Sequence, residues 1–326
     1  LADGGGHAHV LALGVHSRAQ PATGVAQRLR GLAAVQLWRV GAACEEAALC
    51  LGLVHDGACV HCLQWLPHAR APPRLGLLLL VLGDGALQVH AVPLRPFLRP
   101  PGEAPLAEEL LLRLSPAWVA PVALPGAMPE AAWDRRVCCA AAQPGLKAGS
   151  CAIVGGCDHA VVLLWRLTAD GELPLGPCSL FHTPSSDKPT VWSLAWAPGR
   201  GRELFAVGLA SGVLLLWDCR LPAAPVYSYF TQVHSPICSM EWSDPTHVCL
   251  QQLEAAILNL ATKKTTRLLA GFARRHSLEN NCAALCRLRN CVATGWTDGR
   301  LLERLVRQDA ARPARGAQMR TLASWW

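Results

Sequence analysis

The stretch LFAVGLASGVLLLWDCR, residues 204–220, decides the fold class of this chain. Two apolar runs flank a turn of small residues, Ala210, Ser211 and Gly212, and the second run ends in Trp217 and Asp218. Apolar runs of this length, separated by a short turn with glycine, are typical of a β-hairpin. We therefore ask whether the hairpin is a single feature or one copy of a repeated unit.

Four other segments follow the same plan. Each has a small apolar strand, a turn with Asp, Ser or Glu beside Gly or Ala, and a second apolar strand. The later copies follow one another at intervals of roughly 40–55 residues, and blades of a β-propeller repeat about every 40–45 residues. These copies are residues 77–92, 150–167, 246–262 and 290–306.

A histidine or turn cluster leads into a short strand that ends in tryptophan upstream of three hairpins. The three cases are residues 55–65, 182–196 and 234–242. Three strands per unit can therefore be identified. We expect the weakly marked connector to supply the fourth, outermost strand, as at residues 110–119 after the hairpin at residues 77–92. Four-stranded sheets that cover one another around an axis form a β-propeller, so we predict an all-β fold of this kind.

The hairpin at residues 204–220 resembles the WD40 repeat, with a histidine before the first strand, a small polar residue, and a tryptophan that closes the third strand. The resemblance implies a WD40-like β-propeller in which His182, Ser211 and Trp217 join an Asp from a neighbouring turn in a hydrogen-bonded network. The repeats are degenerate, because Trp-Asp occurs only at Trp217-Asp218 among these units. By the same resemblance, structural roles are expected for Asp218, His55, Asp84, Asp158, His234 and Asp298.

Six units can be identified, and the first lacks the histidine-marked strand. We therefore expect a seven-bladed propeller over residues 1–308, with the first identified blade incomplete. The proline-rich segment at residues 93–110 is predicted to be an insertion that loops out of one face. Residues 309–326 are predicted to form a basic C-terminal tail, and the sequence requires no second domain.

Composition excludes several classes of protein. Apolar residues make up 52% of the 326 residues and charged residues 16%, which indicates a folded globular chain. The longest apolar run, residues 75–82, is shorter than the roughly 18–20 residues of a membrane helix, and residues 1–10 have no signal-peptide pattern. The fifteen cysteines lie mostly in strand-like runs, which favours an intracellular, reducing location over a disulfide framework.

Motifs for catalysis or cofactor binding are missing from the sequence. Cys59 and Cys62 have His55 and His61 nearby, but strand residues three apart point to opposite faces, so we predict no metal site. Residues 208–212 fit only part of the nucleophile-elbow pattern, and the turn there joins two strands. We therefore expect no catalytic residues, no cofactor and no small-molecule substrate.

A group of basic residues offers a contact for a partner. The net charge is +7, and Lys263, Lys264, Arg274 and Arg275 are candidates for binding phosphate or an acidic protein segment. Aromatic residues are not interleaved with these positions for base stacking. Any DNA contact would therefore be indirect or limited to the backbone, and strongly dependent on salt.

A closer resemblance covers roughly the first ninety-five residues and residues 191–225. The sequences VQLWRVG, CLGLVHDGACVHCLQWLP and RLGLLLLVLGDGALQVHAVP resemble the WD-repeat subunits of general transcription factor IIIC, which acts with RNA polymerase III. The resemblance implies a nuclear, non-catalytic scaffold that holds other protein subunits in a complex at internal promoters. The alternatives are a WD40 adaptor of another kind, namely a ubiquitin-ligase receptor, a chromatin adaptor or a trafficking-coat component, and an enzyme built on a propeller.

Overall fold

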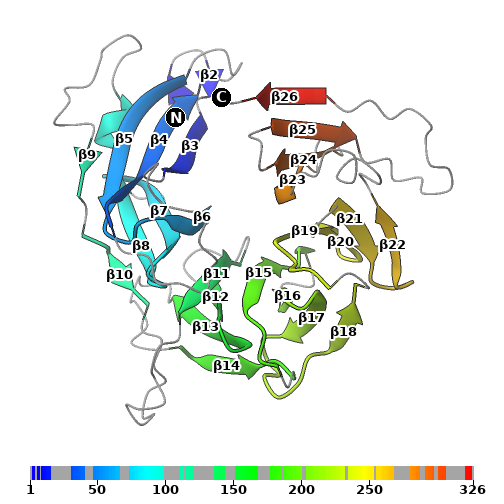
Figure 1. Ribbon diagram of the computed structural model, residues 1–326. Coiled ribbons are helices and arrows are strands. Elements are labelled where there is room, and N and C mark those ends of the chain that lie inside the picture. The colour runs from blue at the N-terminus through cyan, green and yellow to red at the C-terminus, as the bar shows by residue number, and fades with distance from the viewer. Residues whose placement is uncertain are drawn as a thin grey trace. The chain divides into compact units, whose positions relative to one another are not determined.

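The computed structural model shows a chain built almost entirely of β-strands (Figure 1). Six four-stranded sheets and one two-stranded pair are formed by the described residues. The described residues are 2–3, 6–7, 9–15, 31–40, 47–66, 73–98, 111–113, 115–120, 136–143, 151–167, 177–184, 187–199, 203–231, 234–252, 255–267, 280–286, 291–296, 300–305 and 320–324.

The chain divides into two compact units. Unit 1 comprises Leu1–Asp158 and Leu164–Cys178, and unit 2 comprises His159–Leu163 and Ser179–Trp326. Each is described separately below. The division passes through the sheet β11-β12-β13-β14, whose strands are Val137–Ala142, Cys151–Cys157, Val161–Leu167 and Ser179–His182.

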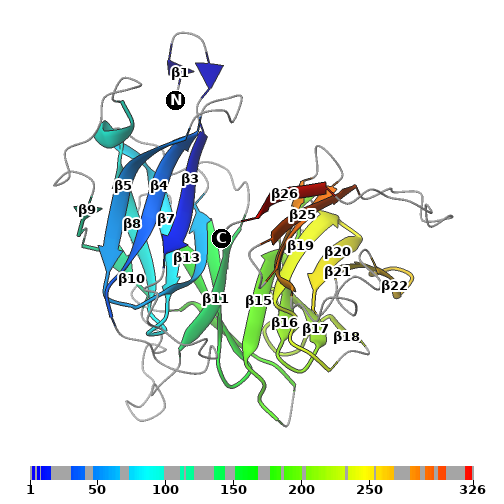
Figure 2. The ribbon, with the colours of Figure 1, turned by 45° about the horizontal axis from the view of Figure 1, so that its top comes forward.

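Unit 1 contains two further four-stranded sheets, which Figure 2 shows with β9 and β10 at their outer edges. Their buried side chains form a common core of mainly leucine and valine, with Phe97 from the short 3-10 helix η1 (Arg95–Leu98). The two-stranded pair joins β1 (Ala2–Asp3) to β2 (Gly6–His7). The first sheet contains β3 (His9–Val15), β4 (Ala33–Val40), β5 (Ala47–His55) and β9 (Leu111–Leu112), and the second contains β6 (Val60–Trp65), β7 (Arg74–Leu82), β8 (Leu87–Pro93) and β10 (Trp118–Val119).

Unit 2 contains three sheets in chain order, each with its strands in sequential order. The first strand of one sheet contacts the first strand of the next, from β15 to β19 and from β19 to β23. These sheets comprise β15 (Val191–Trp196), β16 (Leu204–Leu209), β17 (Val213–Asp218) and β18 (Tyr227–Phe230); β19 (Ser239–Asp244), β20 (His247–Gln251), β21 (Ala255–Asn259) and β22 (Lys264–Arg267); and β23 (Asn280–Cys286), β24 (Cys291–Trp296), β25 (Arg300–Leu305) and β26 (Arg320–Ser324).

The repeat predicted from the sequence is also seen in the structure, because several sheets have a β-bulge at the same position. The first strand of four sheets carries a β-bulge one residue after its start, where an extra residue twists the strand. In three of these sheets the residue after the bulge lies opposite a glycine, namely Gly156, Gly208 or Gly295. The register shifts lie between Val60 and Cys62, Val137 and Cys139, Val191 and Ser193, and Asn280 and Cys282.

The structure corrects the prediction that the first blade is incomplete, whereas the number of seven blades stays a prediction. The described residues form six four-stranded sheets, and the first is complete because β9 supplies its fourth strand, parallel to β5. The segment at residues 110–119, predicted as one outer strand, is divided between two sheets. Leu111 and Leu112 pair with β5, whereas Trp118 and Val119 pair with β8.

The predicted insertion and tail are described only in part. Residues 93–98 contain the end of β8 and η1, and residues 99–110 lie outside the described residues. Within the segment predicted as a tail, Arg320–Ser324 forms β26 and pairs with β25. Those five residues therefore complete the last sheet, because backbone pairing satisfies the outer edge of β25.

The turn between β12 and β13 is the place where a substitution should stabilise the fold. His159 (φ 59°) and Ala160 (φ 61°) both have left-handed backbones, which glycine adopts without strain. Because His159 is exposed, His159→Gly loses no packing, and we expect it to raise the free energy of unfolding by about 0.5–1 kcal/mol. Urea unfolding would measure this gain.

The matched comparison is Ala160→Gly. It should raise the free energy of unfolding by less than His159→Gly, because the Ala160 methyl group is buried and its packing would be lost. A loss of stability in His159→Gly would show that the turn is not left-handed at this position.

Candidate interaction surface

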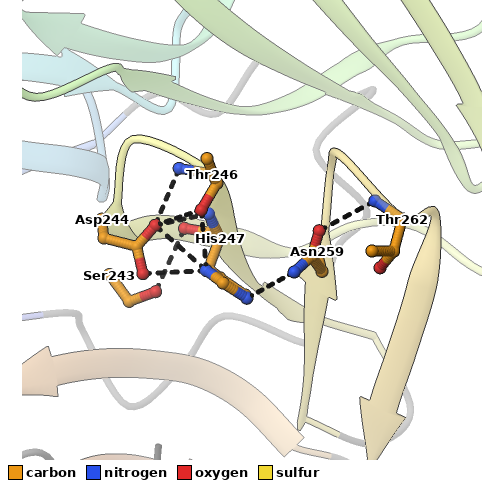
Figure 3. A network of polar contacts seen from close by, with 6 residues as sticks. All are labelled: Ser243, Asp244, Thr246, His247, Asn259 and Thr262. Atoms are coloured by element: carbon orange, nitrogen blue, oxygen red, sulfur yellow. Dashed lines mark hydrogen bonds and ion pairs between the residues drawn. The ribbon is translucent and has the colours of Figure 1, made fainter.

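A network of polar contacts fixes the turn between β19 and β20 (Figure 3). Asp244 Oδ1 accepts hydrogen bonds from the backbone N–H groups of Thr246 at 2.7 Å and His247 at 3.0 Å. It also accepts one from Thr246 Oγ1 at 2.8 Å. An aspartate that binds the backbone two residues ahead forms an Asx turn, so the order Asp-Pro-Thr-His folds locally.

The histidine of this turn links it to the next turn of the same sheet. His247 Nδ1 lies 2.8 Å from Asp244 Oδ2, and His247 Nε2 lies 2.8 Å from Asn259 Nδ2. Asn259 Oδ1 in turn accepts the backbone N–H of Thr262 at 2.9 Å. With the Asn259 amide donating to Nε2, the ring carries its proton on Nδ1 and donates it to Asp244.

This arrangement of Asp, His and Ser holds the turns in place and lacks the geometry of a catalytic triad. Ser243 Oγ donates to the backbone carbonyl of His247 at 3.1 Å, and Asn259 occupies His247 Nε2. A nucleophile activated by histidine would need a hydrogen bond to the ring. Burial raises the pKa of Asp244, but hydrogen bonds from Thr246 and His247 outweigh it and keep the pKa below its usual value.

The second turn carries the two lysines that the sequence predicted as a partner contact. Lys263 is exposed, has a left-handed backbone with φ 56°, and holds its Nζ 5.7 Å from the centroid of the Tyr227 ring. Lys264 begins β22 and is also exposed. The Tyr229 hydroxyl lies 3.0 Å from Thr265 Oγ1 and joins the outer strands β18 and β22.

Two further contacts join the sheet that carries these lysines to the preceding sheet, at the first strands of the two sheets. Ser193 Oγ donates to the carbonyl of Ile237 at 2.6 Å, and Trp242 Nε1 donates to the carbonyl of Ala195 at 3.2 Å. Around them lies an apolar core that includes Leu214 and Leu250 from neighbouring sheets. The sheet that ends in Lys264–Arg267 therefore packs against the preceding sheet through an apolar core and two buried hydrogen bonds.

Within the described part of the chain, Trp217 does not form the network that the WD40 resemblance implies. Its ring is fully buried and packs edge to face on Phe181, with the ring centroids 5.3 Å apart. Among the residues described, Trp217 Nε1 has no hydrogen-bond partner. His182 is exposed at the end of β14, and Ser211 lies in the turn between β16 and β17.

The described aspartates lie apart from one another: Asp84 and Asp218 accept hydrogen bonds within their own turns, whereas Asp158 binds the residue that precedes β11. Asp218 accepts hydrogen bonds from Arg220 N and Nε at 2.9 Å, and the side-chain bonds from Arg220 lower the pKa of Asp218. Asp158 accepts from Arg136 N and Nε at 3.2 Å. Asp84 accepts from the backbone of a nearby residue in its own turn.

The remaining predicted positions are placed only in part. The His234 ring contacts the Phe230 ring in a tilted arrangement, with the centroids 4.8 Å apart. Asp298, Arg274 and Arg275 lie outside the described residues.

Unit 1 buries histidines and cysteines among apolar side chains. Cys62 Sγ donates to the carbonyl of Ala140 at 3.2 Å, whereas Cys59 Sγ lies 4.0 Å from His61 Nε2, so the two thiols have different neighbours. Burial raises the pKa of both Cys59 and Cys62. No group of three or more potential metal ligands is found in the part of the chain that the structure describes.

His90 should make unit 1 sensitive to acid. Burial lowers its pKa below the ordinary 6.5, and the nearby His55 lowers it further. His90 Nε2 lies 2.9 Å from Gln88 Oε1, and the buried Nδ1 has no hydrogen-bond partner among the described residues. As pH falls below about 6.5, the unfolded chain binds a proton that folded His90 resists, so stability is lost on acidification.

We therefore expect His90→Leu to weaken the loss of stability between pH 7.5 and pH 5, measured by urea unfolding at each pH. His182→Gln is the matched control, because His182 is exposed and its replacement should leave the pH dependence unchanged. An identical pH dependence in the wild-type protein and His90→Leu would contradict the assignment.

Within the described ranges, no helix is long and apolar enough to cross a membrane.

Comparison with known proteins supports the fold. No protein-family model and no curated protein matches this chain. A chain in a solved structure, described as the crystal structure of the mitotic checkpoint complex, matches with a TM-score of 0.51 at 13% identity, over 85% of this chain and 71% of that chain. With the successive four-stranded antiparallel sheets, this match shows a WD40-like β-propeller fold.

Proposed function

We propose that this chain is a non-catalytic scaffold that holds other proteins in a multi-subunit assembly. The observation behind the proposal is the surface of unit 2, where the Asp244 and His247 side chains are used to fix turns that present exposed lysines. A rigid surface with charged side chains suits recognition of a partner. The structural match to a chain of a protein complex supports the same function.

The assembly that we propose resembles transcription factor IIIC, with nuclear localisation and protein subunits as partners. This finer proposal rests on the sequence resemblance over roughly the first ninety-five residues and residues 191–225. DNA contact, in this proposal, is indirect or limited to the backbone.

The test is affinity purification of the tagged chain from nuclear and cytoplasmic extracts, followed by crosslinking mass spectrometry. Recovery of transcription factor IIIC subunits in stoichiometric amounts is the expected result. Recovery of ubiquitin-ligase, chromatin or coat subunits alone would keep the scaffold and overturn the transcription assignment. A specific enzymatic turnover by the purified chain would overturn the scaffold itself.

A further inference from the structure

We propose that the outer edge of β22 binds an acidic, extended segment of a partner protein as an added strand. This inference rests on the proposed scaffold function and names the chemistry of one partner. In the sheet order β19-β20-β21-β22, β22 is the last strand. None of the described strands pairs with the outer side of β22, so its backbone groups there can pair with a further strand.

The charge on this edge selects the partner. Lys263 and Lys264 stand next to each other, and neither residues 260–267 nor residues 226–231 contain an acidic side chain. The nearby Asp244 carboxylate is occupied by donors from Thr246 and His247. Among the described residues the lysines have no acidic neighbour in these two segments, and an acidic strand would neutralise their positive charge.

The turn before β22 is held in one conformation before any partner binds. Asn259 receives the Thr262 N–H at 2.9 Å, and the Leu260 N–H donates to the Thr246 carbonyl at 2.8 Å, so the two turns of the sheet are tied together. Lys263 keeps a left-handed backbone, which costs free energy in a residue with a side chain. Such preorganisation reduces the ordering cost of binding.

An edge strand with lysines discriminates between partners. Lysine on an edge strand opposes pairing with apolar or basic strands, which is a common protection against aggregation. A strand with glutamate or aspartate opposite Lys264 would instead gain a favourable cross-strand pair. We therefore expect the outer edge of β22 to pair with acidic strands and to reject apolar and basic ones.

A protein strand fits this surface better than a single-stranded nucleic acid. Nucleic acids bind without sequence preference by stacking their bases on free aromatic faces. Here the Tyr227 ring is covered by Lys263, and the Tyr229 hydroxyl is engaged with Thr265. Both tyrosines are half-buried.

The test measures binding of a fluorescein-labelled (Glu-Val)4 peptide to the full chain by fluorescence anisotropy. We expect saturable binding that weakens about tenfold in Lys263→Glu/Lys264→Glu, because charge reversal turns attraction into repulsion. Lys263→Arg/Lys264→Arg should keep binding, since it keeps the charge. Asn259→Ala should weaken binding a few-fold by loosening the turn. Hydrogen exchange at residues 264–267 should slow when the peptide binds.

The matched control is Lys188→Glu, because Lys188 is also exposed and also has a left-handed backbone. It should leave the affinity unchanged. Equal peptide affinity in the wild type and Lys263→Glu/Lys264→Glu would overturn the proposal. Hydrogen exchange at residues 264–267 that stays the same or becomes faster when the peptide binds would also overturn it. If a dT10 oligonucleotide binds more tightly than the peptide and its binding depends on the two lysines, the site binds nucleic acid and the proposal of an acidic protein strand is wrong.

Failure of this inference is distinguishable from failure of the scaffold. If the wild-type chain purifies in a stoichiometric assembly but does not bind the peptide, only the β22 site is wrong. If it binds the peptide but purifies alone, the scaffold proposal is wrong.

Discussion

Trp217→Ala is expected to lower the free energy of unfolding by about 3–5 kcal/mol, the usual cost of removing a fully buried large aromatic ring. Trp217 is completely buried and contacts Phe181, which also packs edge to face on Phe205 with the centroids 5.2 Å apart. A cavity at Trp217 would therefore remove support from both rings. Urea unfolding followed by circular dichroism would measure the loss.

Phenylalanine at the same position separates packing from hydrogen bonding. Trp217→Phe keeps most of the ring and removes an Nε1 group that has no partner among the described residues, so we expect a much smaller loss than for alanine. Trp242→Phe is the matched comparison, because it breaks the bond from Nε1 to the Ala195 carbonyl. If Trp217→Phe costs more than Trp242→Phe, Trp217 takes part in a hydrogen-bonded network and our account of it is wrong.

Gly208→Ala is expected to cost about 3 kcal/mol, the sum of overpacking and a disturbed buried hydrogen bond. An added Cβ would lie 2.5 Å from Ser193 Oγ and 2.9 Å from the Ile237 side chain. The Ser193 hydroxyl holds the Ile237 carbonyl at 2.6 Å, so the change would weaken the junction between two sheets. Thermal or urea unfolding measures the cost.

A double-mutant cycle with Ser193→Ala tests this cause. Removing the hydroxyl relieves one of the two close contacts, so Gly208→Ala should cost less in the Ser193→Ala background than in the wild type. Additive effects would show that the two residues do not meet as the structure places them.

Most of the inner strands were predictable because local patterns specify them. The hairpin at residues 204–220 is formed by β16 and β17, with its turn at Gly212 in the left-handed conformation that glycine favours. Such hairpins need only two apolar runs and a suitable turn, and these signals come from residues that are adjacent in the sequence.

The outer strands were harder to predict because their pairing depends on distant residues. Leu111 and Leu112 pair with β5, more than fifty residues earlier, and β26 pairs with β25 across a long connection. Two-residue strands such as β9 have no periodicity to detect. The first blade therefore was expected to be incomplete, and the last strand was assigned to a tail.

The candidate surface was predicted in part. Lys263 and Lys264 stood out by charge, but the network behind them was missed, because His247 and Asn259 meet only after β20 pairs with β21. One local signal was available, since Asp244 followed by proline and threonine is typical of an Asx turn. The expected hydrogen bond of Trp217 came from the family resemblance, and the described residues supply no partner for it.

The central claim is that the chain works by holding other proteins, and its native mass tests this most directly. The measurement is size-exclusion chromatography of cell extract with light scattering, following the endogenous chain by quantitative mass spectrometry. We predict that most of the chain elutes in a particle several times heavier than the chain alone, with constant partner ratios across the peak. Elution at the mass of the chain alone, without a co-eluting partner, would contradict the account.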